Sequence, residues 1–173
     1  MPAPSVASLF AQRVVVGVAD LGVSNNPSIT LSTYALGSCI GVVAYEPRLQ
    51  VGGLLHFMLP ESKISPEKAA AQPAMFADTG LPLLFRSLLG LRAQPANMRF
   101  LLAGGASVIE GHDQFRIGER NIRATLDFLA QHRIRPDHRI LGGTTNRTLH
   151  LDVATGIVKL KAPEGLESYS LAG

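Results

Sequence analysis

The sequence predicts a single-domain α/β sandwich in which two main helices pack on mixed β-sheets. A length of 173 residues is enough to enclose one hydrophobic core. Apolar residues make up 46% of the chain and charged residues only 17%, as in a compact globular protein. Short apolar runs separated by glycine and proline turns outnumber helical patterns, which favours a strand-rich fold. We expect the domain to span residues 13–162, between an N-terminal arm (1–12) and a C-terminal tail (163–173).

Short runs rich in Val, Ile and Leu predict the strands. They are bounded by turn residues or polar segments and cover residues 13–19, 29–36, 40–45, 51–59, 98–103 and 139–141. Residues 149–153 then alternate apolar and polar side chains, and Thr155-Gly156 turns the chain into a last run at 157–161. This pattern predicts a terminal hairpin with one solvated face.

Two helices are predicted between these strands. The first has an apolar stripe at helical spacing, formed by Leu81, Leu84, Phe85, Leu88 and Leu89. Pro82 lies in its first turn or kinks it. The second helix covers residues 119–133, with an inward face formed by Ile122, Leu126 and Leu129. The polar segments 20–28 and 60–72 are predicted to be loops.

The charge and the first residues limit the class of protein. A net charge of +3, with scattered Lys and Arg, argues against nucleic acid as a partner. Residues 1–10 lack the charged and long apolar regions of a signal peptide, and no stretch approaches the roughly 20 apolar residues of a membrane helix. One cysteine excludes an internal disulfide and fits the reducing cytoplasm. We therefore expect a cytoplasmic protein without membrane insertion.

Cys39 is the only cysteine, and it lies in a glycine-flanked break, Gly37-Ser38-Cys39-Ile40-Gly41, between two apolar runs. His56 follows in the next apolar run, 51–59. A lone thiol at a tight turn, with an imidazole in the following strand, is the minimal arrangement for a thiolate nucleophile and its base. The alternative is an inert core cysteine, because free cysteine is among the most buried residue types.

The surroundings of both residues favour chemistry. Gly37 allows a sharp turn, and the N–H of Cys39, helped by Ser38, can then stabilise an oxyanion. In a strand, His56 shares a face with apolar side chains, so a buried imidazole needs a polar partner, which Cys39 or Thr33 can supply. The alternative for His56 is a half-buried histidine satisfied by one backbone hydrogen bond.

The remaining glycines and histidines give weaker signals. Three Gly-Gly pairs, at 52–53, 104–105 and 142–143, adjoin apolar runs without the spacing of a phosphate loop. Turns at strand ends explain them, although Gly104-Gly105 can also line a cleft. The other four histidines show no metal-ligand spacing with each other or with the cysteine, so we expect no metal and no cofactor.

Several motifs together resemble the CheD family of chemoreceptor glutamine deamidases. They occur in order between about residues 14 and 161, and they are Thr33-Tyr34-Ala35-Leu36-Gly37-Ser38-Cys39, Gly52-Gly53-Leu54-Leu55-His56-Phe57-Met58-Leu59-Pro60, Phe76-Ala77-Asp78-Thr79, Ala103-Gly104-Gly105-Ala106 and Ile117-Gly118-Glu119-Arg120-Asn121. The chain departs from the family pattern at Phe76 and Gly80, where Tyr and Ala are more common.

The resemblance implies an α/β sandwich related to deamidating bacterial toxins and a triad of nucleophile Cys39, base His56 and third member Thr33. The implied activity is that of a protein-glutamine glutaminase, which converts receptor glutamines to glutamate and releases ammonia during chemotaxis adaptation. The substrate is the cytoplasmic domain of a methyl-accepting chemoreceptor. In this hypothesis His56 takes the thiol proton, and the resulting imidazolium lowers the pKa of Cys39. A glutamyl methyl ester would pass through the same thioester, so methylesterase activity is also expected.

Two other functions are alternatives to the deamidase. CheD-like proteins also dock on a CheC-type phosphatase, so the chain can be a docking module with little catalysis. A thiol protease or acyltransferase would use the same nucleophile with another acceptor cleft. The intact Thr33, Cys39 and His56 favour the deamidase, because a docking module has no need of them.

Overall fold

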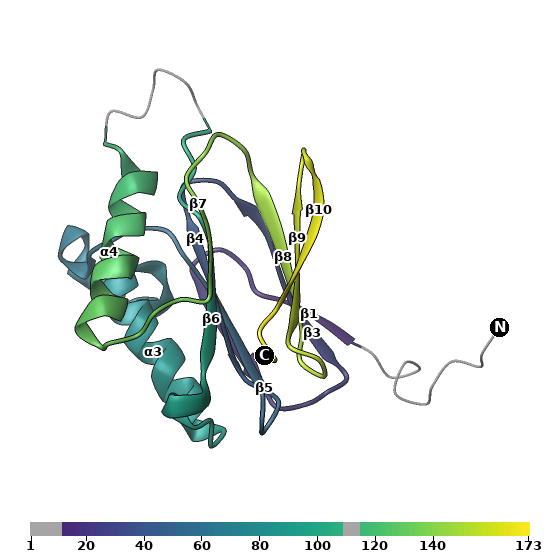
Figure 1. The fold of residues 1–173 in the computed structure, drawn as a ribbon. Coiled ribbons are helices and arrows are strands. Elements are labelled where there is room, and N and C mark those ends of the chain that lie inside the picture. Colours follow the sequence, from purple (N-terminus) through teal and green to yellow (C-terminus); the bar gives the residue numbers. More distant parts are fainter. Residues whose placement is uncertain (1–11, 109–114) are drawn as a thin grey trace.

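The computed structural model describes residues 12–108 and 115–173, and these form three layers (Figure 1). Two helices cover one face of a five-stranded sheet, which we call the inner sheet, and a second five-stranded sheet, the outer sheet, packs on its other face. Each sheet holds one parallel strand pair among antiparallel ones. The predicted α/β sandwich with mixed sheets is confirmed.

The inner sheet contains the central strands of the fold. Its order is β2 (Asp20–Ser24), β5 (Val51–Phe57), β4 (Ile40–Glu46), β6 (Arg99–Gly104) and β7 (His138–Leu141). Every residue of β4 and β5 is buried. Both strands are covered on both faces, which explains why their sequences are almost continuously apolar.

The outer sheet has one solvated face. Its order is β1 (Gln12–Val15), β3 (Ile29–Leu36), β8 (Arg147–Asp152), β9 (Ile157–Ala162) and β10 (Gly165–Ser170). On β9, buried Val158 and Leu160 alternate with exposed Lys159 and Lys161. The hairpin of β8 and β9 therefore has the one-sided burial that its alternation predicts.

Two hydrophobic cores separate the layers. Leu54 of β5 joins the core between the two sheets, whereas Leu55 joins the core between the inner sheet and the helices. Because side chains alternate along a strand, His56 faces the same side as Leu54. The imidazole therefore points toward the outer sheet.

The helices pack largely as the periodicity predicts. Helix α3 spans Ala77–Gly90 and α4 spans Ile117–Gln131. In α3, Leu81, Leu84 and Leu88 are fully buried, whereas Leu89 of the predicted stripe is exposed. Pro82 lies inside α3, beyond its first turn. The predicted inward residues of α4 all contact the core under the helices.

The two segments predicted as loops contain regular structure. Residues 20–28 include β2, which pairs with β5 at the edge of the inner sheet. An edge strand is held by backbone hydrogen bonds, so its few apolar residues left no clear periodic signal. Residues 60–72 contain the short helices η1 (Ser62–Ile64) and α2 (Pro66–Ala71), and two further 3-10 turns follow at η2 (Pro73–Met75) and η3 (Pro95–Asn97). The predicted strand 13–19 stops at Val15, where the chain leaves the outer sheet for β2.

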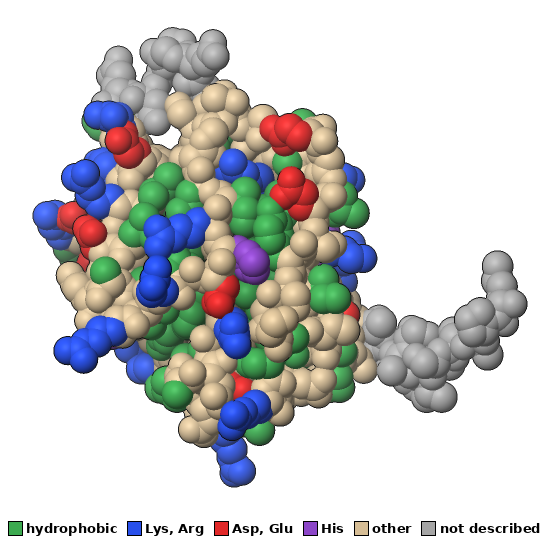
Figure 2. Space-filling view, in the orientation of Figure 1, with side chains coloured by type: hydrophobic (Ala, Val, Ile, Leu, Met, Phe, Trp, Pro, Cys, Tyr) green, Lys and Arg blue, Asp and Glu red, His purple; other side chains and the backbone are tan. Residues whose placement is uncertain are grey.

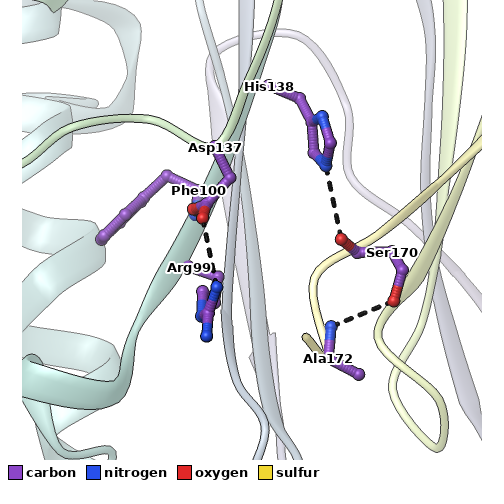
Figure 3. A network of polar contacts seen from close by, with 6 residues as sticks. All are labelled: Arg99, Phe100, Asp137, His138, Ser170 and Ala172. Atoms are coloured by element: carbon purple, nitrogen blue, oxygen red, sulfur yellow. Dashed lines mark hydrogen bonds and ion pairs between the residues drawn. The ribbon is translucent and has the colours of Figure 1, made fainter.

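The predicted C-terminal tail, 163–173, is largely part of the fold. Its strand β10 pairs with β9, and the Leu171 side chain is buried between the sheets. The Ser170 carbonyl lies 3.3 Å from Nε2 of His138, which ties the end of the outer sheet to the inner sheet (Figure 3). Because β10 is polar and paired mainly through its backbone, the sequence contains no apolar run that would predict it. Of the predicted arm, residues 1–11 lie outside the described part.

Truncation of Leu171 tests whether the C-terminal segment stabilises the sandwich. Leu171→Ala is expected to lower the free energy of unfolding by about 2–5 kcal/mol, because it removes a buried side chain from between the sheets. Leu166→Ala on β10 is the matched control, since that side chain is exposed, and a change within about 0.5 kcal/mol is expected. Urea denaturation measures both. Equal stability of the two variants would contradict this account.

Candidate active site

Cys39 lies in the turn between β3 and β4, where its side chain is partly buried. Three consecutive carbonyl groups of this turn accept hydrogen bonds from other parts of the fold: Gly37 from Ala106 N–H (2.9 Å), Ser38 from the Asn121 amide (3.0 Å) and Cys39 from Gly105 N–H (2.9 Å). These bonds fix the turn. In the described residues, the N–H groups of Ser38 and Cys39 have no backbone acceptor.

The four residues predicted to form the oxyanion site and the cleft take two different positions. Gly37 and Ser38 line a cavity beside Cys39, as expected. Gly104 and Gly105 are buried behind the turn. Gly104 has a φ of +112°, and a Cβ at this position would lie 2.1 Å from the Cys39 carbonyl oxygen. Only glycine allows this approach, so the Gly-Gly pair supports the turn from behind.

His56 and Thr33 meet inside the core between the sheets. The Thr33 hydroxyl lies 2.7 Å from the Val16 carbonyl oxygen and 2.7 Å from Nδ1 of His56. Both side chains are fully buried. A hydroxyl has one proton, and the carbonyl can only accept, so Thr33 donates to Val16 and accepts from the His56 Nδ1–H. This assignment leaves the lone pair of the imidazole on Nε2.

Nε2 of His56 is unprotonated, so its lone pair can accept a proton. It is buried and has no hydrogen-bond partner among the described residues. Burial also lowers the pKa of His56 to about 4, so the ring is neutral near pH 7. An unpaired buried acceptor costs stability, and such groups are typical of functional sites.

The register of β4 and β5 brings Cys39 to the same face as His56. Gly41 is the direct cross-strand partner of His56, and Cys39 precedes Gly41 by two residues. Cys39 packs against the core between the sheets, toward which His56 also points. Diagonal neighbours of this kind have Cα atoms about 7–8 Å apart, within reach of side chains. The two side chains form no hydrogen bond in this structure.

The thiol is neutral in this arrangement. Burial raises the pKa of Cys39, and the smaller opposing effect comes from its own backbone N–H. The expectation that an imidazolium lowers this pKa therefore does not describe the resting protein. A neutral thiol and a neutral imidazole face the same space instead.

A cavity of about 480 Å³ adjoins the thiol, and we call it the thiol cavity. Among the described residues, its wall is mostly apolar and holds no charged side chain. Beyond the turn residues it includes Ala35, Ala106, Ser107, Val108, Phe115, Ile117 and Asn146. Phe115 is 72% exposed at its rim. A neutral, extended side chain such as that of glutamine fits this environment better than a charged one.

Asn121 is a site residue whose role the sequence patterns did not predict. It lies on α4, fully buried, and its amide nitrogen also donates to the Met58 carbonyl at 2.8 Å. One side chain thus links the turn before Cys39 to the strand end after His56. Its only signal in the sequence was membership of the 117–121 motif, because a polar residue on an inward helix face follows no periodicity rule.

A family model described as CheD chemotactic sensory transduction matches residues 58–162. The chain is also 44% identical over 152 residues to a probable chemoreceptor glutamine deamidase CheD 1 from Syntrophus aciditrophicus (strain SB), which covers 88% of this chain and 95% of the relative. The chain belongs to the CheD family. A CheD relative from Pyrococcus abyssi (strain GE5 / Orsay), also named a probable chemoreceptor glutamine deamidase, is 37% identical over 154 residues, covering 88% and 93% of the two chains.

The departures from the CheD pattern lie away from the thiol cavity. Phe76 and Gly80 are buried at the start of α3, and a Cβ at Gly80 would lie 3.3 Å from Leu55 of β5. Among the described residues, no three His, Cys, Asp or Glu side chains come together as a metal site requires. Within the same part of the chain, no helix is long and apolar enough to cross a membrane.

Removal of the Asn121 amide tests the link between the two halves of the site. Asn121→Ala is expected to lower the free energy of unfolding by about 1–3 kcal/mol, because the partly buried carbonyls of Ser38 and Met58 lose their donor. Gln131→Ala, at the exposed end of the same helix, should change it by less than about 0.5 kcal/mol. Urea denaturation compares the two. Wild-type stability of Asn121→Ala would contradict the link.

The pH dependence of Cys39 alkylation tests the neutral state of the pair. Iodoacetamide reacts with the thiolate, so the raised pKa predicts slow reaction at pH 7 and a rate that rises about tenfold per pH unit and is still rising at about pH 9. His56→Gln is expected to give the same profile, because no resting ion pair is lost. A fast reaction that persists below pH 6 in the native protein and disappears in His56→Gln would instead indicate a thiolate–imidazolium pair.

Proposed function

We propose that this protein deamidates glutamine side chains of methyl-accepting chemoreceptors, converting them to glutamate with release of ammonia during chemotaxis adaptation. The observation that carries the proposal is the hydrogen-bonded series Val16–Thr33–His56, which leaves an unprotonated Nε2 on the face that Cys39 shares. The described residues that line the thiol cavity beside Cys39 are uncharged, which supports a neutral amide substrate. The names of the relatives, probable chemoreceptor glutamine deamidases, support the receptor as substrate.

Acylation begins with attack of the Cys39 sulfur on the side-chain carbonyl carbon of a bound glutamine. Because thiol and imidazole are both neutral at rest, the thiol proton moves to Nε2 of His56 as the carbon–sulfur bond forms. The negative charge moves to the carbonyl oxygen. The N–H groups of Ser38 and Cys39 are the proposed donors to this oxyanion, since the carbonyls of the same turn are bonded elsewhere.

The tetrahedral intermediate then loses ammonia. His56 returns its proton to the departing nitrogen, the carbon–nitrogen bond breaks, and a glutamyl thioester remains on Cys39. Throughout this cycle Thr33 accepts the Nδ1–H, which fixes the tautomer and stabilises the transient imidazolium. The positive charge of this buried imidazolium is also compensated by the negative charge of the oxyanion, which forms at the same time.

Hydrolysis repeats the steps with water as the nucleophile. His56 removes a proton from water, which attacks the thioester, and the same proton then restores the thiol. The net reaction consumes one water and yields glutamate and ammonia. A glutamyl methyl ester would give the same thioester with loss of methanol, so we include methylesterase activity as a side reaction.

Mass spectrometry of a receptor cytoplasmic fragment tests the activity. The native protein should add about 1 Da at each modified glutamine, and Cys39→Ala should add none because the nucleophile is absent. His56→Gln should lower kcat by about 10²–10⁴-fold through loss of the base. Thr33→Val should lower kcat less, because the base remains but its tautomer is no longer held. His132→Gln, at an exposed position on the end of α4, serves as the control.

Two outcomes would overturn the proposal. A folded Cys39→Ala protein that still releases ammonia would exclude the thiol as nucleophile. An unmodified receptor, together with capture of a CheC-type phosphatase by both native protein and Cys39→Ala, would identify a docking module instead.

A further inference from the structure

A second cavity lies on the solvated face of the outer sheet, and we call it the basic cavity. Its volume is about 450 Å³, within the range of ligand-binding sites. The polar side chains that line it are those of Arg13, Tyr34, Asn146, Thr148, His150 and Lys161. None of the described residues that line it is acidic. Lys and Arg side chains project along the edge that the outer sheet forms at the right of Figure 2.

Several contacts hold the wall of the basic cavity in place. Nδ1 of His150 lies 2.6 Å from the hydroxyl of Ser32, which is fully buried. The Tyr34 ring meets the His150 ring edge-on at a centroid distance of 5.7 Å. Arg13 donates to the Tyr34 hydroxyl at 3.4 Å. These contacts connect the aromatic and imidazole groups of the wall to one another and to Ser32.

The field inside the basic cavity is positive. Burial lowers the pKa of His150, and the charges of Arg13, Lys159 and Lys161 lower it further. All three of these neighbours are cations, and among the described residues no carboxylate contributes to the shift at His150. Such a cluster of uncompensated cations favours an anion.

The basic cavity adjoins the thiol cavity. Asn146 lines both, and a Cβ at Gly37 in the turn of Cys39 would lie 2.9 Å from its Oδ1. The consecutive residues Tyr34 and Ala35 line the basic and the thiol cavity respectively. Ala35 has a φ of +57°, and the pairing of β3 with β8 shifts register between Thr33 and Leu36. This irregularity in β3 brings one side chain to each cavity.

We propose that the basic cavity binds the carboxylate of an acidic residue that lies close to the target glutamine in the same substrate segment. Lys161 and Arg13 supply the charge, and the amide and hydroxyl of Asn146 and Thr148 supply further hydrogen-bond donors. The inference rests on the proposed function and makes it more specific: the preferred substrate is a glutamine with Glu or Asp within about one helical turn.

A matched pair of receptor fragments tests this preference. Both carry the same single glutamine of a receptor cytoplasmic domain, with either Glu or Ala one helical turn away on each side. We expect native kcat/KM to be about tenfold higher for the acidic fragment at low salt. At 1 M salt, where the Debye length is about 3 Å, the ratio should approach one.

Two lysines of β9 provide the variant and its control. Lys161→Glu should abolish or reverse the preference for the acidic fragment. Lys159→Glu makes the same charge change on the same face of the strand, but Lys159 does not line the basic cavity and acts on it only through the field at His150, so it should reduce the preference less than Lys161→Glu does. A native ratio near one, or equal loss of preference in both variants, would overturn the inference.

A binding measurement separates this inference from the proposed function. Calorimetry with Cys39→Ala and the same fragments should give tighter binding of the acidic fragment, lost when Lys161→Glu is added. If neither fragment is deamidated by the native protein, the proposed function fails, and this difference in affinity still decides the role of the basic cavity. Equal affinity for both fragments would refute it.

Discussion

The hydrogen bond between His56 and Thr33 joins the two sheets within the hydrophobic core, and the arrangement of the site depends on it. Thr33 belongs to the outer sheet and His56 to the inner sheet. A buried imidazole and hydroxyl are tolerated there because they satisfy each other and the Val16 carbonyl. The exception is Nε2 of His56, which has no hydrogen-bond donor among the described residues. This missing hydrogen bond costs stability, and the same nitrogen is the proposed base.

A second constraint positions the proposed nucleophile, Cys39, from the other side. The backbone of the Cys39 turn is bonded to the end of β6 and, through Asn121, to α4. The turn therefore presents its thiol to the cavity while its carbonyls are occupied. Because α4 also binds the strand end after His56, a shift of that helix would move both parts of the site together.

Burial distinguishes the proposed mechanism from that of a permanently charged cysteine–histidine pair. The pKa of the thiol is raised and that of the imidazole is lowered, both mainly by desolvation. In the proposed mechanism, neither group is charged until a substrate carbonyl is available to accept the electron pair of sulfur. A neutral resting thiol is less exposed to oxidation and alkylation, since the thiolate is the reactive form.

Much of this protein follows from its sequence. Periodicity predicted β3 and β4 and both main helices, because burial on one or two faces is recorded in the spacing of apolar residues. The motifs around Cys39 and His56, with the resemblance they carry, led to the CheD family and to Thr33 as partner of the imidazole. Strands β2 and β10 were missed because edge pairing uses backbone groups, which leave little trace in side-chain identity.

Other properties were decided only by the tertiary structure. The tautomer of His56 depends on the Val16 carbonyl, which another part of the chain supplies. The pKa directions depend on how much water the packed sheets exclude, and the roles of Asn121 and of Gly104 depend on contacts with a distant turn. Local sequence determines which groups are present and which face they occupy. Distances between groups on different elements, and hence their protonation and hydrogen bonding, exist only once the layers have packed.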